Sequence, residues 1–87
     1  MQARIMKVDE KRSKYGGIFY YVFFKDTETG QSIRSCIDPK MGNYKRWHEF
    51  LAPGVVLGNL RTITRRDGST LIDADSLPEF IRKEEDA

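Results

Sequence analysis

The chain of 87 residues lacks the features of a disulfide-bonded, metal-binding or membrane-spanning protein. Its single cysteine, Cys36, cannot form an intramolecular disulfide, and no set of Cys and His residues has metal-ligand spacing. No apolar run approaches the roughly 20 residues of a membrane helix, and residues 1–7 lack the apolar region of a signal peptide. We therefore expect a cytoplasmic protein with no metal, no cofactor and no membrane partner.

The sequence also lacks a recognisable catalytic constellation. Asp73 and Asp75 lie two residues apart, but no partner base, nucleophile or Gly-rich phosphate loop accompanies them. His48 stands among charged residues and is expected to be an exposed side chain. We therefore expect a binding protein and not an enzyme.

The charge of the chain is unevenly distributed. Residues 1–72 contain 13 Lys and Arg against 7 Asp and Glu, whereas residues 73–87 contain 2 against 6. A basic body with an acidic end is compatible with nucleic-acid contact, although ordinary solvated surface charge has the same appearance.

The most informative stretch is residues 16–25, GGIFYYVFFK, which is rich in aromatic and β-branched side chains and predicts a strand. Side chains alternate between the two faces of a strand. Ile18, Tyr20, Val22 and Phe24 therefore share one face, and Phe19, Tyr21, Phe23 and Lys25 share the other. We expect the row that includes Lys25 to face outward, while burial of both rows remains the alternative.

The rest of the chain predicts a mainly β protein with one short helix. Asn43 is suited to capping that helix, Gly58 marks a bulge or a close backbone approach, and Asp67-Gly68 is a strong hairpin signal. A helical or frayed end is expected over 79–87. The predicted strands are 2–8, 18–25, 31–38, 55–66 and 69–75, with the helix at 44–51.

Three strands, a helix and a two-stranded hairpin, in that order, resemble the OB-fold, a five-stranded, partly open Greek-key barrel. The resemblance covers about residues 2–81 and rests on element order, the segment PGVVLG at 53–58 and LIDADS at 71–76. It implies that Trp47, Phe50 and Leu51 close one barrel end. The expected domain is residues 1–81, followed by a short acidic tail over 82–87.

The small OB proteins that bind single-stranded DNA are the group that the chain resembles most. The resemblance implies a binding face on the second and third strands, flanked by the loops Glu10–Gly17 and Arg65–Ser69. Aromatic side chains there would stack on bases, and cations would contact phosphates. The predicted nucleic-acid contacts are Lys11, Arg12, Lys14, Tyr15, Phe19, Tyr21, Phe23, Lys25, Arg34, Arg65 and Arg66.

This reading predicts binding of single-stranded DNA with little sequence preference. Two alternatives stay open: an RNA-binding OB domain, and a protein-interaction module that uses the aromatic face as a dimer or partner interface. A homodimer is compatible with each of them.

Overall fold

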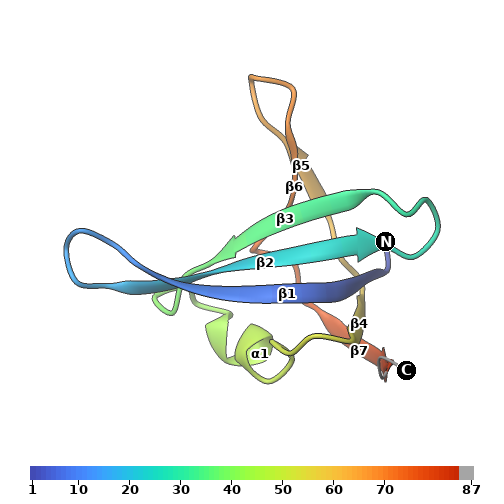
Figure 1. The fold of residues 1–87 in the computed structure, drawn as a ribbon, viewed down its shortest axis with the longest axis horizontal. Helices are drawn as coiled ribbons and strands as arrows, with labels where there is room; N and C mark the ends of the chain where they lie inside the picture. Colours follow the sequence, from blue (N-terminus) through green and yellow to red (C-terminus); the bar gives the residue numbers. More distant parts are fainter. Residues whose placement is uncertain (85–87) are drawn as a thin grey trace.

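A computed structural model describes residues 1–84 of the chain and shows a mainly β protein with one short helix (Figure 1). One curled, mixed sheet forms a half-barrel with the strand order β5-β6-β3-β2-β1-β4-β7. The predicted class is confirmed, but the described residues contain seven strands and not five. The elements are β1 (Ala3–Arg12), β2 (Ile18–Asp26), β3 (Ser32–Ile37), α1 (Tyr44–His48), β4 (Val55–Gly58), β5 (Thr62–Thr64), β6 (Thr70–Ile72) and β7 (Glu79–Lys83).

The first three strands form an antiparallel meander whose inner face makes the core. Val22 and Phe24 of β2 are buried, and β3 contributes Ile33 and Ile37 from its alternate positions. Branched and aromatic side chains suit such a pleated, half-buried surface, which is why this stretch is strand. The two faces of β2 are therefore divided as its alternation predicts.

A bulge in β1 changes which of its side chains face outward. Ile5 pairs with Phe24 and Lys7 pairs with Phe23, so Met6 is an extra residue on β1. Ile5 is buried, Val8 packs against the core, and Met6 and Lys7 are both exposed. Simple alternation cannot place Ile5 and Val8 on one face, and the bulge allows it.

The predicted strand 55–66 is two strands, β4 and β5, separated by residues 59–61. Asn59 adopts a left-handed φ of 58°, and its side-chain amide donates to the carbonyl of Leu77 at 3.0 Å. This conformation is rare outside Gly and Asn, and it turns the chain out of the strand. β4 then pairs with β1, whereas β5 pairs with β6 in the hairpin predicted from Asp67-Gly68.

The helical or frayed end predicted over 79–87 is wrong for 79–83, which form β7 on the edge of the sheet beside β4. β7 crosses the expected boundary between residues 81 and 82; residues 85–87 of the predicted tail lie outside the described part. Gly58 is a position of close approach, because a Cβ there would lie 2.9 Å from Cδ1 of Ile81. Pairing with β4 overrides the weak local preference of this segment.

The helix α1 lies beneath the meander in Figure 1, on the side opposite the β5–β6 hairpin. Trp47 is fully buried against Phe24, and its indole N–H donates to the carbonyl of Ala74 at 2.9 Å. Phe50 and Leu51 pack on the core from beyond the helix end, which comes at His48 and not at residue 51. Asn43 precedes the helix, but its side chain makes no cap; it donates to the carbonyls of Ala74 and Ser76.

The chain therefore has one core, closed on one side by α1. Within residues 1–84, no helix has the length and apolar character needed to cross a bilayer.

Candidate nucleic-acid interface

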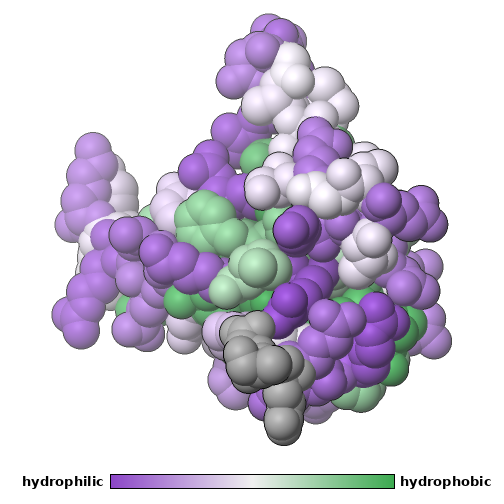
Figure 2. Space-filling view, turned by 45° about the vertical axis from the view of Figure 1, so that its right-hand side comes forward, coloured by the Kyte–Doolittle hydropathy of each residue, from purple (hydrophilic) through white to green (hydrophobic). Residues whose placement is uncertain are grey.

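The outer face of β2 carries a row of three aromatic rings, Phe19, Tyr21 and Phe23, each partly exposed. Phe19 meets Tyr21 edge to face, with ring centroids 5.3 Å apart. Figure 2 shows a small hydrophobic area on one side of the molecule, between hydrophilic projections. Partly exposed rings on a sheet offer flat apolar surface without leaving a large apolar patch in water.

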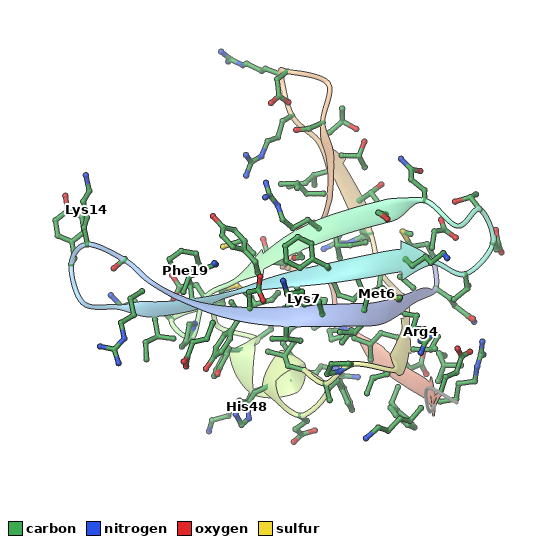
Figure 3. All side chains as sticks on the ribbon, viewed as in Figure 1. Arg4, Met6, Lys7, Lys14, Phe19 and His48 are labelled. Carbon is green, nitrogen blue, oxygen red and sulfur yellow. The ribbon has the colours of Figure 1, made fainter. Side chains whose placement is uncertain are left out.

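Two cations from the neighbouring strands stand over this row. The ammonium of Lys7 on β1 lies 5.8 Å from the centroid of the Phe23 ring, and the guanidinium of Arg34 on β3 lies 5.1 Å from that of Tyr21. Strand pairing places both cations there, because Lys7 and Arg34 are each opposite Phe23. Lys7 is labelled on β1 in Figure 3. The row therefore alternates flat rings with positive charge.

Lys11 and Arg12 lie in β1 and not in a loop, because the strand continues to residue 12 as one side of a long ribbon. Lys11 pairs with Phe19 and shares the outer face with the aromatic row. Arg12 pairs with Ile18 and points to the opposite face. The structure thus separates two cations that the sequence grouped together.

The tip of the β1–β2 ribbon carries Lys14 and Tyr15. The ammonium of Lys14 lies 5.9 Å from the centroid of the Tyr15 ring, and Tyr15 is 90% exposed. Figure 3 places Lys14 at the far end of the ribbon, beyond Phe19. Hydrogen bonds from the backbone amides of Tyr15 and Gly17 to the Ser13 hydroxyl hold the tip.

The predicted loop Arg65–Ser69 is the tip of the β5–β6 hairpin, which stands above the meander in Figure 1. Asp67 accepts hydrogen bonds from the hydroxyl and the amide of Ser69, and these bonds lower the pKa of its carboxyl. Gly68 has a φ of 87°, as the turn requires. Arg65 and Arg66 are both exposed at this tip.

Cys36 is an exposed thiol on the outer face of β3, opposite Tyr21. Partial burial, followed by the charge of Asp38, raises the pKa of this thiol. Arg34 and Arg65 act on the same pKa in the opposite direction. A thiol with a raised pKa is not activated as a nucleophile.

Lys25 is separated from the other predicted contacts. It ends the outer row of β2, but its side chain passes over the turn at Gly30. There it lines a hollow with Arg4, Arg82 and the acidic residues Asp26 and Glu84. Of the predicted contacts, Phe19, Tyr21, Phe23, Lys11 and Arg34 come together on one face.

Sequence reasoning missed Lys7 and Asp9 as members of this face. Both follow the bulge at Met6, which no local signal in residues 2–8 indicates. Asp9 pairs with Tyr21 and forms an ion pair with Lys7 at 3.4 Å, so one carboxylate lies among the cations.

Comparison with known proteins assigns neither a family nor a function. No protein-family model, curated protein or solved structure matches the chain.

Proposed function

We propose that this protein binds single-stranded DNA, with little sequence preference, on the outer face of β1, β2 and β3. The observation that carries the proposal is the interleaving of rings and cations: Lys7 stands over Phe23, Arg34 stands over Tyr21, and Lys11 is opposite Phe19. Every base has a flat π-face that can stack on a ring, and every phosphate attracts a cation. A surface made of these two elements binds strands without reading base edges.

We also propose that the half-barrel is an OB-fold in which one strand is bent. β4 and β5 are separated by three residues. Because β4 pairs with β1 and β5 pairs with β6, the two together connect the ends of the series β6-β3-β2-β1. Counted as one bent strand, they reduce the seven strands to six, of which five form the barrel circuit and β7 is an addition at the edge. The parallel pair Arg34–Leu71 connects β3 to β6 and completes the circuit.

The test is fluorescence anisotropy of a labelled thymidine oligonucleotide, titrated at low salt with the wild-type protein, Tyr21→Ala and Phe23→Ala. We expect wild-type binding and a loss of about 1–3 kcal/mol for each variant, the usual contribution of one stacked base. Thermal unfolding checks that both variants fold. We expect them to fold because the side chains of Tyr21 and Phe23 are partly exposed. An affinity that neither truncation changes would exclude the aromatic row as the binding surface.

The same titration compares the remaining alternatives. An RNA oligonucleotide of equal length tests the RNA-binding alternative, which predicts tighter binding of RNA than of DNA.

The edge strand β7 offers little support for a homodimer, since its bulge at Ile81 and its charges at Glu79, Arg82 and Lys83 discourage pairing between edges. Cytoplasmic location and the homodimer stay predictions.

A further inference from the structure

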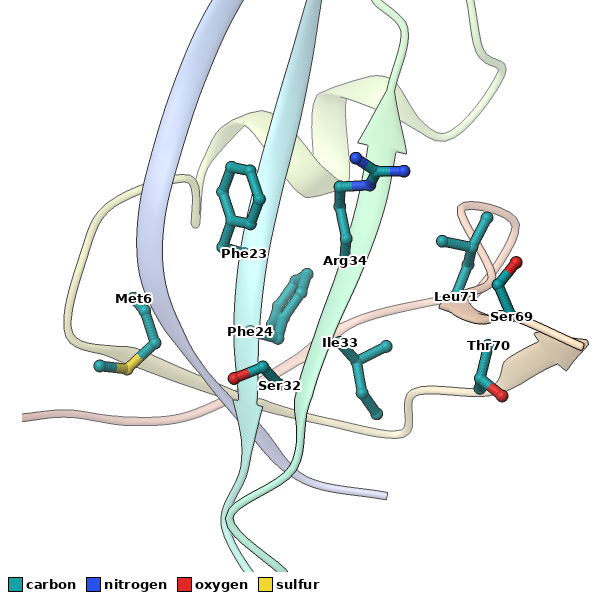
Figure 4. A pocket seen from close by; sticks show the side chains of 9 residues that line it. All are labelled: Met6, Phe23, Phe24, Ser32, Ile33, Arg34, Ser69, Thr70 and Leu71. Atoms are coloured by element: carbon teal, nitrogen blue, oxygen red, sulfur yellow. The ribbon is translucent and has the colours of Figure 1, made fainter.

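A groove opens where the β5–β6 hairpin leaves the sheet (Figure 4). β3 and β6 are joined by the single pair Arg34–Leu71, supported by a hydrogen bond from the buried Ser35 hydroxyl to the carbonyl of Ile72 at 3.1 Å. Away from this pair, the starts of β3 and β6 diverge, and the groove between them has a volume of about 400 Å³. Such a volume is within the range of ligand pockets in proteins.

The lining of the groove combines flat or apolar walls with a polar rim. Phe23, Ile33 and Leu71 supply the apolar surface, and Ser32, Ser69 and Thr70 supply three hydroxyl groups. The remaining polar group is the Arg34 guanidinium, which lies at the upper rim in Figure 4. A nucleobase has matching chemistry, with apolar faces and an edge of hydrogen-bond donors and acceptors, and it is attached to a phosphate.

The groove adjoins the aromatic row, because it is lined by Phe23 of the row and by Arg34, whose guanidinium lies over the Tyr21 ring. A single strand that followed the row from Phe19 to Phe23 would therefore arrive at the groove. The Lys7 ammonium adds positive charge at this end of the row. The surroundings therefore favour an anionic chain whose bases are free to leave the stack.

We infer that the groove holds one unstacked base of the bound single strand, while Arg34 contacts the adjoining phosphate. This inference rests on the proposed function and adds one defined base position to it. The hydroxyl groups of Ser32, Ser69 and Thr70 contact the polar edge of that base, and rotatable hydroxyls can donate to or accept from any base. The groove thus adds affinity without imposing a strict sequence requirement.

The first test fills the groove. Thr70→Trp and Ser32→Trp place a large side chain in it from opposite walls, and Thr62→Trp is the matched control on the same hairpin, outside the lining. We expect each filling variant to bind the thymidine oligonucleotide about tenfold more weakly, because the base in the groove loses its contacts with Phe23 and the other walls. The control should change affinity less than twofold.

The second test reads the groove directly and does not depend on the folding of a variant. Methyl NMR of the wild-type protein follows Leu71 in the groove and Leu77, an exposed side chain outside its lining. Ring currents of an inserted base should shift the Leu71 methyl resonances when the oligonucleotide is added, and an abasic oligonucleotide should not shift them. The Leu77 methyl resonances should be unaffected in both cases.

The outcomes separate the two proposals. If the wild-type protein binds DNA but the Leu71 methyl resonances do not shift, the groove proposal is overturned and the proposed function stays intact. The same holds if the filling variants bind DNA normally. Failure of the wild-type protein to bind any single strand overturns both. A Leu71 shift that depends on protein concentration without DNA identifies a second copy as the occupant and also overturns the groove.

Discussion

At the scale of single residues, the aromatic row is already paired with cations before any ligand arrives. A cation over an exposed ring contributes about 0.5–1 kcal/mol, whereas a base stacked on a ring contributes about 1–3 kcal/mol. Stacking therefore exceeds the interaction that it replaces. Displaced from the rings, the side chains of Lys7 and Arg34 become free to contact phosphates. This exchange explains how rings and cations can share one surface without excluding the ligand.

Asp9 is the one acidic side chain that pairs directly with the row, opposite Tyr21. Replacing it in Asp9→Asn removes a charge that repels phosphates and frees Lys7 from its ion pair. We expect affinity for single-stranded DNA to rise by about 0.5–1 kcal/mol, the size of an exposed charge interaction. Glu10→Gln is the matched control, because Glu10 lies next along β1 on the opposite face. Equal gains from both substitutions would indicate that only net charge matters.

Cys36 provides a native probe at the centre of the same face. The raised pKa of its thiol keeps it protonated at pH values where an ordinary cysteine begins to ionise, so alkylation should be slow near pH 8 and faster as pH rises. Bound single-stranded DNA should slow the reaction several-fold further by covering Cys36. At 1 M salt, where binding is screened, this protection should vanish. Unchanged alkylation at saturating DNA would place the ligand elsewhere.

At the scale of elements, alternation in 18–25 predicts β2 and its two faces, because one core sorts the side chains of one strand. Three other features, namely a bulge, a bend and an edge strand, were not predictable in the same way. The bulge at Met6 depends on pairing with β2, the bend at Asn59 depends on a bond to Leu77, and β7 depends on the edge of β4. Each is a long-range interaction without a local sequence signal. The candidate site gained Lys7 because of the bulge, and it lost Arg12 because β1 continues to residue 12, where the expected loop would lie.

A substitution at Gly54 tests whether residue 84, which follows β7, packs against this glycine. Its amide donates to the carbonyl of Ile5, its carbonyl accepts from the amide of Glu84, and its φ is 92°. A Cβ in Gly54→Ala would meet the carbonyl oxygen of Glu84. Gly68→Ala is the control, since Gly68 has a similar φ but open space around it.

Both substitutions force alanine into a left-handed conformation, at about 1–2 kcal/mol. Gly54→Ala should cost a further ~1–3 kcal/mol from overpacking. Urea unfolding measures the difference between the two variants. Equal losses of stability would show that residue 84 does not approach Gly54 in solution.

At the scale of the whole molecule, charge and shape converge on one side of the half-barrel. The β1–β2 ribbon and the β5–β6 hairpin both extend beyond the core in Figure 1 and carry Lys14, Arg65 and Arg66 at their tips, and the aromatic row lies on β2 of the ribbon. The basic excess of residues 1–72 is thus partly concentrated around one face. A single strand on that face would be held by several phosphates, which makes its affinity depend on salt.

The most direct measurement is a salt titration of oligonucleotide binding by the wild-type protein, Lys11→Ala and Arg12→Ala. Lys11 and Arg12 are adjacent in one strand and point to opposite faces. The two alanine variants therefore have the same net charge and similar stability, and they differ in which face loses a cation. With about three to five phosphate contacts, the log–log slope of the wild-type protein should be roughly −2 to −3.5. Lys11→Ala should weaken binding and make the slope shallower by about 0.7, and Arg12→Ala should change neither. Equal effects of the two substitutions, or an affinity independent of salt, would contradict binding on the outer face.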